Sequence, residues 1–403
     1  MSIIAFQLAT RQASTINIAS SEQDADALYK QILFFNPQSE VIFLPAWDCL
    51  PYDRISPSCK IMNQRVQSLA NITTAKNPII ITSITGFCQK FPNPAIIEKL
   101  TLSTGDKVNM KQIIDFLIAN GYVRVGSATD SGEFAARGDL VDIVTAHGAY
   151  RINIAWDMVE NIKQYTPDTQ ITSHKVEAIN IYSASELKLN SDNIDNFKRN
   201  FRQRFGVNHT KDPLYTHISE GIRFNGAEHL LPIFYDKLMS LMELVPSAEI
   251  IVDPMMEIAK NELYLSINDF YNARLEANNN KAQQFYFTLK PDSLWLPEEQ
   301  LTKLSIISFD NKNIKLLPNF NLEAKNAKKP VCELLLDFAN NNHDKFIIIA
   351  CVSNSSLNRL QNMLAQYDYN NYIKINNIQS VIKNKKCLVK NIELTHSFVA
   401  GNN

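Results

Sequence analysis

The fold is decided by residues 15–83, in which three short apolar runs alternate with helical patterns: Thr15-Ile-Asn-Ile-Ala19, Val41-Ile-Phe-Leu44 and Ile79-Ile-Ile-Thr-Ser83. The segments between these runs, 22–35 and 60–73, carry apolar residues at helical spacing. Ser20 or Ser21 is in position to cap the first of them. Because continuous apolar strands joined by helices are typical of a parallel sheet covered on both faces, we expect an α/β fold here.

Strict alternation replaces the continuous apolar runs between about residues 121 and 182. One face of a strand would carry Tyr150, Ile152, Ile154 and Trp156, and the other face Arg151, Asn153 and Ala155. Glycines at positions 126, 132, 138 and 148 fit turns or bulges. The pattern predicts a small, antiparallel, β-rich domain inserted into the chain, with the apolar set in its core.

The rest of the chain returns to mixed patterns. We expect Ser191 to cap a helix that ends at Phe205, since Gly206 follows its last apolar residue. A strand over 249–253 and a helix around 261–274 follow. The stretch 309–330 is rich in Asn and Lys and predicts a linker. Beyond it, a further βα unit is expected from the segments 331–340, 346–352, 356–367 and 386–392.

Composition excludes several classes of protein. The chain has 403 residues, 45% hydrophobic and 20% charged, with a net charge of −1, which suits several globular domains and excludes a globally basic nucleic-acid coat protein. Its longest apolar runs are far shorter than the ~20 residues of a membrane span. Its six cysteines form no C-x-x-C, so we expect reduced thiols in the cytoplasm and neither disulfides nor a zinc site.

Glycine usage argues against a nucleotide site. None of the 11 glycines is followed by Lys, and no two are separated by one residue, so G-x-x-x-x-G-K-[ST] and G-x-G-x-x-G are both absent. The sequence also has no Asp-Glu dipeptide, no H-E-x-x-H and no G-x-S-x-G, and its seven histidines are scattered. We therefore expect no catalytic residue, no metal and no cofactor in this chain.

Three segments, in this order, carry a resemblance to a known family. They are Leu44-Pro-Ala-Trp-Asp-Cys-Leu-Pro-Tyr-Asp-Arg-Ile-Ser-Pro57 with Arg65 on the next helix, Gly121-Tyr-Val-Arg-Val125 with Gly132-Glu-Phe-Ala-Ala-Arg-Gly-Asp-Leu-Val-Asp-Ile143, and Asp292-Ser-Leu-Trp-Leu-Pro297. Together they resemble the N-terminal part of the bacterial transcription-repair coupling factors (Mfd), a degenerate relative of the excinuclease subunit UvrB. The resemblance covers residues 15–310 well and 331–403 more loosely, where Leu394-Thr-His-Ser-Phe-Val399 is similar to the end of a small domain of the family.

The resemblance implies an α/β architecture around a degenerate, helicase-like parallel-sheet domain that is discontinuous in sequence. Residues 1–118 would form its first part and residues 189–310 its second. Residues 119–188 would be the inserted, small β-rich α+β domain, which in this family docks on the damage sensor UvrA. Residues 311–330 would be a linker and residues 331–403 a small C-terminal α/β domain. The family's polymerase-binding and translocase domains would lie beyond residue 403.

The alternative is UvrB itself, an ATP-dependent DNA-processing enzyme of the helicase type. UvrB resembles the chain in the same segments, but it carries a phosphate loop before its first strand and a long, tyrosine-rich hairpin that clamps damaged DNA by stacking. Here the chain begins almost at the family's first strand, and the short loop Trp47–Ser58 stands in place of that hairpin. The missing glycines and lysine argue against this alternative, which micromolar ATP binding would favour.

The resemblance also implies a partner-binding site. Arg137, Arg151 and Ala155 match the positions at which the family contacts UvrA. Arginine suits such a contact because its planar guanidinium binds both oxygens of a carboxylate and is frequent in interface hot spots. The family's third contact is an aromatic side chain, which Ala155 lacks, and alternation places Trp156 on the opposite face.

Each of these arginines also has a purely structural interpretation. Glu133, Asp139 and Asp142 lie close to Arg137 and Arg151 in the sequence and offer partners for surface ion pairs. Such pairs contribute little to stability and need no binding partner to explain them.

Nucleic-acid contacts are a further candidate. Lys198, Arg199, Arg202 and Arg204 lie on the helix that ends at Phe205, where they either contact phosphate or balance the helix C-terminus on a solvated face. Residues 311–403 are also basic, with 12 Lys and Arg against 6 Asp and Glu. A nucleic-acid-binding module of this kind would show a steep salt dependence of its DNA affinity.

The loop Trp47–Pro57 offers two interpretations. Trp47, Tyr52 and Arg54 either stack a base or pack the loop onto the sheet edge, with Asp53 paired to Arg54. Cys49 has no basic or His neighbour in sequence to lower its pKa, so we assign it no nucleophilic role.

The resemblance therefore predicts a non-catalytic adaptor, the UvrB-like N-terminal module of a transcription-repair coupling factor. It would recruit UvrA to stalled RNA polymerase in transcription-coupled nucleotide excision repair. We expect a cytoplasmic monomer that hydrolyses no ATP by itself, whereas full-length members of the family are ATP-dependent DNA translocases. Contacts with RNA polymerase and double-stranded DNA are expected of the downstream domains.

Overall fold

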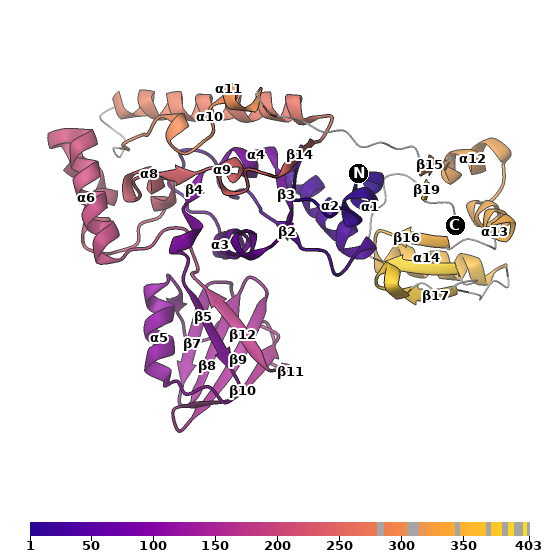
Figure 1. Ribbon diagram of the computed structural model, residues 1–403, viewed down its shortest axis with the longest axis horizontal. Helices are drawn as coiled ribbons and strands as arrows, with labels where there is room; N and C mark the ends of the chain where they lie inside the picture. The colour runs from indigo at the N-terminus through magenta and orange to yellow at the C-terminus, as the bar shows by residue number, and fades with distance from the viewer. Residues whose placement is uncertain are drawn as a thin grey trace.

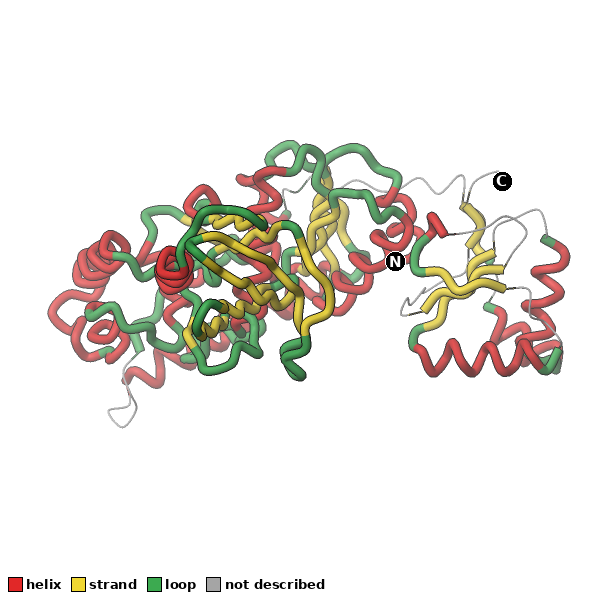
Figure 2. Tube along the Cα trace, turned by 90° about the horizontal axis from the view of Figure 1, so that it is seen from below, coloured by secondary structure: helices red, strands yellow, loops and turns green. Residues whose placement is uncertain are grey.

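A computed structural model of the chain describes residues 1–279, 286–302, 304, 314–317, 319–342, 347–367, 372–380, 386–390 and 398–400. Its strands form two main sheets, a parallel one near the N-terminus and a larger one that projects below it (Figure 1). A small third unit lies beside α1 and α2, at the opposite end of the molecule from α6 (Figures 1 and 2). Within the described residues, no helix is both long and apolar enough to span a bilayer.

The parallel sheet has four strands in the order β14 (Glu249–Val252), β1 (Thr15–Ala19), β3 (Ile79–Ser83) and β2 (Val41–Phe43), and every neighbouring pair is parallel. Helices α1 (Ser2–Ala9) and α2 (Glu22–Phe35) pack on one face around Ile79 and Ile81. The opposite face, with Ile16 and Ile80, packs on α3 (Cys59–Thr74) and α4 (Ile84–Cys88). The expected α/β class and the sheet covered on both faces are confirmed.

The second part of this unit is mostly helical and completes its core. It consists of α6 (Ser191–Phe205), α7 (Pro213–Ser219), α8 (Leu231–Phe234), α9 (Leu241–Leu244), α10 (Met256–Asn279) and α11 (Glu298–Leu301), with the short pair β4 (Phe91–Pro92) and β13 (Leu238–Met239). The expected cap of α6 was wrong by one residue. Asn190, not Ser191, is the N-cap, because its Oδ1 accepts the backbone N–H of Asn193 at 2.9 Å.

The larger sheet has six strands in the order β11 (Thr172–Val176), β10 (Met158–Tyr165), β9 (Gly148–Ala155), β8 (Leu140–Thr145), β7 (Glu133–Arg137) and β6 (Val123–Arg124). All neighbours are antiparallel except β6 and β7. Helix α5 (Met110–Ala119) covers one face, where Ile113 and Leu117 join Phe134, Val141 and Ile152 in a core separate from that of the parallel sheet (Figure 1).

The strand β5 (Lys99–Ser103) and helix α5 belong to this second core. We had expected residues 1–118 to lie in the parallel-sheet part. β5 pairs antiparallel with β12 (Ala178–Tyr182), and Leu102 is buried with Ile179 and Ile181. A long-range pairing of this kind leaves no periodic signal near residue 100, so the sequence pattern did not reveal it. We refer to residues 99–182 as the six-stranded unit.

The third unit is a parallel sheet in the order β16 (Ile347–Cys351), β18 (Lys386–Lys390) and β17 (Tyr372–Ile375), with helices α13 (Val331–Asn341) and α14 (Asn354–Ala365). Part of the expected linker is ordered, because residues 320–327 form α12 and β15 (Ile314–Leu316) pairs with β19 (Phe398–Ala400). Most of the segment 394–399 and residues 305–313 lie outside the described residues. Phe398 contacts the rings of Phe6 and Phe35, at centroid distances of 5.9 and 6.3 Å.

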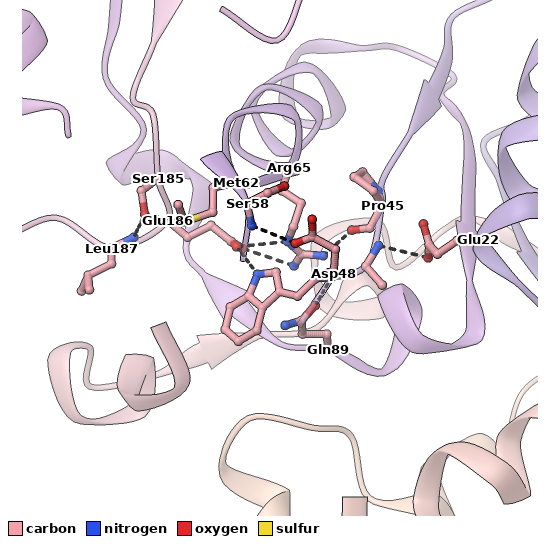
Figure 3. A network of polar contacts seen from close by, with 12 residues as sticks. Glu22, Pro45, Asp48, Ser58, Met62, Arg65, Gln89, Ser185, Glu186 and Leu187 are labelled. Atoms are coloured by element: carbon pink, nitrogen blue, oxygen red, sulfur yellow. Dashed lines mark hydrogen bonds and ion pairs between the residues drawn. The ribbon is translucent and has the colours of Figure 1, made fainter. Parts of the chain in front are cut away.

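A buried ion pair fastens the segment that follows β12, where the chain leaves the six-stranded unit, to α3 of the parallel-sheet unit. Arg65 on α3 donates from Nε and Nη2 to the carboxylate of Glu186 at 3.0 and 3.2 Å, and from Nη1 to the carbonyl of Pro45 at 2.6 Å. The indole of Trp47 donates to the same carboxylate at 3.0 Å. Figure 3 shows the side chains of Arg65 and Glu186 facing each other. The side chains of Arg65 and Glu186 are 0% and 3% exposed, so each charge depends on the other.

A second set of polar contacts holds the two chain crossings of the six-stranded unit side by side. Lys188 Nζ donates to the carbonyl of Ile96 at 2.7 Å and to the carboxylate of Glu98 at 2.9 Å. The side chain of Asn120 donates to the same carboxylate, and with Lys188 it lowers the pKa of Glu98. The entry and exit of the six-stranded unit are therefore fastened to each other as well as to α3.

The loop after β2 packs onto the sheet edge, as one of the two interpretations held. Trp47 and Tyr52 are buried, and Trp47 contacts the ring of His229. The expected pair between Asp53 and Arg54 was wrong: Arg54 pairs with Asp212 at 2.7 Å. Asp212 lies in the helical second part of the unit and was too distant in sequence to be identified.

We predict that removal of the buried carboxylate destabilises the whole chain. Glu186→Leu leaves the Arg65 guanidinium buried without a counter-charge, which costs about 3–5 kcal/mol of unfolding free energy. The matched control is Lys237→Ala, which removes an exposed partner of Glu243 (Lys237 side chain 73% exposed) and costs less than about 1 kcal/mol. Urea unfolding measures both, and equal losses for the two variants would contradict the assignment.

Candidate partner-binding surface

The three positions implied by the resemblance lie on one face of the six-stranded sheet. Residues that are directly opposite on neighbouring strands point to the same face. Arg151 is opposite Asp142 and Lys163, while Arg137 belongs to the next row of the sheet with Leu140 and Asn153. Ala155 follows Asn153 by two residues and ends the strand. The structure therefore brings Arg137, Arg151 and Ala155 into consecutive rows of the face opposite α5.

Arg151 is held by groups of its own chain. It donates from Nε and Nη2 to the two oxygens of Asp142 at 2.7 and 2.8 Å, and its guanidinium lies over the ring of Tyr165, 5.3 Å from the centroid. The hydrogen bonds to Asp142 raise the pKa of Arg151. Asp142 is almost completely buried, so this pair is part of the sheet and is more than a loose surface contact. The ion pair that the purely structural interpretation of Arg151 predicted is therefore present in the molecule.

Arg137 differs from Arg151 because it is exposed at the end of β7. Its guanidinium donates to the backbone carbonyl of Gly126, and among the described residues no carboxylate pairs with it. Gly138 follows in the left-handed region with φ of 55°, which turns the chain sharply into β8. The side chain of Arg137 is consequently available to a carboxylate from another molecule.

The expectation for Trp156 was wrong. Alternation placed it in the core with Ile152 and Ile154, but its side chain is 99% exposed. Ala155 is opposite Met158, so Trp156 and Asp157 form a two-residue turn in which both φ angles are positive, 55° and 54°. Alternation holds only while the strand continues, and the turn directs the indole into solvent. We call Trp156 and Asp157 the hairpin tip.

Three basic residues of α6 each contact a group of their own chain. Arg202 is turned toward Tyr215 and donates to its hydroxyl, Lys198 approaches Asp195 at 3.8 Å, and Arg199 donates to Asn196 at 2.8 Å. The buried face of α6 carries Phe197 and Phe201. A nucleic-acid contact through Lys198, Arg199 and Arg202 stays a prediction.

A contact that the sequence did not reveal lies beside the buried loop. Cys49 Sγ is 3.7 Å from Nε2 of His229, which is 180 residues away in the chain. Burial, with Asp48 and Glu228, raises the pKa of Cys49 to about 12, and burial lowers the pKa of His229. Both groups are therefore neutral at pH 7, which opposes formation of a nucleophilic thiolate. In the part of the chain that the structure describes, no group of His, Cys, Asp and Glu side chains is arranged to hold a metal ion.

Comparison with known proteins finds similarity to one family model and to several relatives. Residues 100–187 match the family model of the UvrB interaction domain. The chain is 37% identical over 363 residues to a transcription-repair-coupling factor from Rickettsia bellii, and 36% identical over 373 residues to one from Rickettsia conorii. It is 26% identical over 302 residues to the transcription-repair-coupling factor of Escherichia coli.

These matches cover most of this chain but a smaller part of each relative. They include 87%, 89% and 73% of the chain, and 32%, 33% and 26% of the respective relatives. The chain spans about a third of the length of the curated relatives it matches.

We predict that the two arginines differ in their effect on stability. Arg151→Ala leaves the carboxylate of Asp142 buried without its partner and costs about 1–3 kcal/mol of unfolding free energy. Arg137→Ala removes an exposed side chain and changes the stability by less than about 0.5 kcal/mol. Denaturant unfolding of both variants measures the difference, and a larger loss for Arg137→Ala would contradict these environments.

Proposed function

We propose that this chain, which is related to the transcription-repair-coupling factors, acts as an adaptor that recruits UvrA through its six-stranded unit. The main support for the proposal is that two independent observations give nearly the same limits for this unit. The match to the UvrB interaction domain covers residues 100–187, and the strands and helix that share one hydrophobic core extend from β5 to β12, residues 99–182. A unit with its own core that projects from the rest of the chain is suited to docking (Figure 1).

The proposed domain arrangement follows the cores rather than the boundary at residue 119. Residues 1–98 and 183–304 would form the discontinuous parallel-sheet domain, and residues 99–182 the inserted one. Burial of Leu102, Ile113 and Leu117 with the strands of the six-stranded unit supports this division. Residues 314–400 would form the C-terminal unit.

The proposed UvrA-binding residues are Arg137, Arg151 and Ala155. Their positions in consecutive rows of one sheet face support this assignment. Arg137 would supply the intermolecular ion pair, since its own chain leaves it exposed. Arg151, paired with Asp142, would mainly shape the surface, and Ala155 would leave space for a partner side chain.

We propose that the parallel sheet binds no nucleotide. In nucleotide-binding α/β proteins, phosphate lies at the carboxyl end of a parallel strand, against the N-terminus of the following helix. Here that place, between β1 and α2, is occupied by the chain's own side chains. Ser21 caps the helix, and Glu22 accepts from the backbone N–H of Ala46 at 3.1 Å and from the hydroxyl of Ser83. The carboxylates of Glu22 and Asp24 in the first turn would repel a phosphate.

The remaining functions of the relatives are proposed to lie outside the aligned third of their length. Contacts with RNA polymerase and double-stranded DNA, and ATP-driven translocation along DNA, would be supplied by parts of the relatives with which this chain does not align. The chain would then act as a non-catalytic module that brings UvrA to a stalled polymerase.

We predict that UvrA binding depends on Arg137. Arg137→Ala weakens binding by about 1–3 kcal/mol, because it removes a charge-assisted contact from an interface hot spot. The matched control is Arg199→Ala, which removes the same side chain from an exposed position on α6 and leaves the affinity unchanged. Biolayer interferometry at fixed salt measures both. A loss that is equal in the two variants would indicate nonspecific charge attraction and contradict the assigned surface.

We also predict that the chain hydrolyses no ATP, with or without DNA, because carboxylates fill the position that phosphate would occupy. A coupled ATPase assay on the purified monomer measures the turnover. DNA-stimulated hydrolysis that co-elutes with the folded chain would contradict the proposal and favour a helicase-type enzyme.

A further inference from the structure

Trp156 is exposed to a degree that its own fold does not require. The chain has three tryptophans, and the other two, Trp47 and Trp295, are 7% and 5% exposed. Tryptophan carries one of the largest apolar surfaces of any side chain and is enriched at protein interfaces for that reason. An indole that is 99% exposed on the hairpin tip leaves this surface in water in the free chain.

The backbone of the hairpin tip is strained and firmly supported. Two-residue turns with positive φ at both positions favour Asn-Gly or Asp-Gly, whereas this chain has Trp-Asp. A non-glycine residue in the left-handed region carries a conformational cost that the surrounding structure must offset. Here the loop 105–108 supplies that support: the N–H of Val108 donates to the carbonyl of Asp157 at 3.0 Å, and Val159 exchanges hydrogen bonds with Gly105 and Asp106 at 2.8 and 2.9 Å.

The support holds the backbone of the turn, so that the turn itself need not be ordered when a partner binds. A side chain on a hydrogen-bonded turn loses less freedom in a complex than one on a mobile loop. The hairpin tip is therefore a pre-organised position for an anchor residue.

The hollows beside Trp156 combine apolar side chains with charged ones at their edges. One of about 400 Å³ is lined by Val108, Met158 and Lys107, and one of about 250 Å³ by Met110, Ile154 and Asp139. Met158 and Leu140 are also partly exposed, at 42% and 37%. The second hollow reaches the turn after β7 at Gly138, whereas the guanidinium of Arg137 donates to Gly126 on the far side of β7. An apolar centre with a charged group at its edge is typical of a protein interface.

We propose that Trp156 is the aromatic anchor with which this chain docks on UvrA, and this inference rests on the proposed function. The indole enters an apolar pocket of the partner, and Arg137 pairs with a carboxylate at a separate point of the same partner. The aromatic side chain missing at Ala155 is thus supplied one residue later, from the turn instead of the strand. A second copy of this chain is the competing occupant of the same surface.

The experiment compares three chains for binding to purified UvrA by biolayer interferometry: the parent, Trp156→Asn and Trp156→Phe. Asn adopts positive φ more readily than other non-glycine residues, so Trp156→Asn preserves the turn while it removes the ring. The expected loss is about tenfold or more for Trp156→Asn and less than about threefold for Trp156→Phe. Unchanged thermal unfolding of both variants is the control for folding.

Iodide quenching of tryptophan fluorescence gives an independent readout on the parent chain. Trp156 is the exposed one of the three indoles, so it accounts for the quenching of the free chain, and UvrA should suppress that quenching. The fluorescence of Trp156 in the complex is isolated in one of two ways: UvrA without tryptophan is used, or the signal of the complex with Trp156→Phe is subtracted from that of the parent complex.

Each of the other outcomes overturns the inference, and together they show whether the proposed function fails with it. If the parent binds UvrA while Trp156→Asn binds within twofold and quenching is unchanged, Trp156 is not the anchor and the proposed function stands. If the parent does not bind UvrA, the proposed function fails, and the inference fails with it. If quenching falls with the concentration of the chain alone, a second copy occupies the surface and UvrA does not.

Discussion

The buried ion pair between Arg65 and Glu186 is the interaction on which the arrangement of the molecule depends. The six-stranded unit is inserted into the parallel-sheet unit, so its position is set where the chain leaves and returns. Glu186 lies on the returning segment, Arg65 lies on α3, and Trp47 and the carbonyl of Pro45 complete the set of partners. Because an unpaired charge at this depth is strongly unfavourable, the pair fixes the returning segment on α3, and with it the place at which the six-stranded unit is attached.

With that attachment fixed, the two units have different chemistry. The parallel sheet keeps an architecture that elsewhere binds nucleotides, but Glu22 and Ser21 fill the end of β1 where phosphate would lie. The six-stranded unit packs one face against α5; on the other face Ala135 and Tyr165 belong to a small buried cluster, while Arg137 is exposed. We therefore assign scaffolding to the first unit and recognition to the second, with the strained hairpin tip as the part of the second unit that the fold alone does not explain.

Sequence patterns predicted the elements whose signal is local. Continuous apolar runs predicted the parallel strands, and alternation predicted which side of β9 faces the core as far as Ile154. The prediction failed at Trp156 because a turn begins there and alternation ends. The remaining contacts that sequence patterns did not predict join segments far apart in the chain. β5 pairs with β12, about 80 residues later, Arg54 pairs with Asp212, and Arg65 pairs with Glu186. No local pattern encodes such pairs. The resemblance predicted contacts at Arg137 and Arg151, but only the structure separates the exposed guanidinium from the paired one.

The central claim is that recognition of UvrA belongs to one face and one turn of the six-stranded unit. Hydrogen–deuterium exchange of the whole chain, with and without UvrA, tests it most directly because every region is observed at once. UvrA is expected to slow exchange in residues 137–142 and 150–160, and to leave α6 and the parallel strands β1 and β3 unchanged. Protection of α6 or of the parallel sheet, with no change at the hairpin tip, would contradict it.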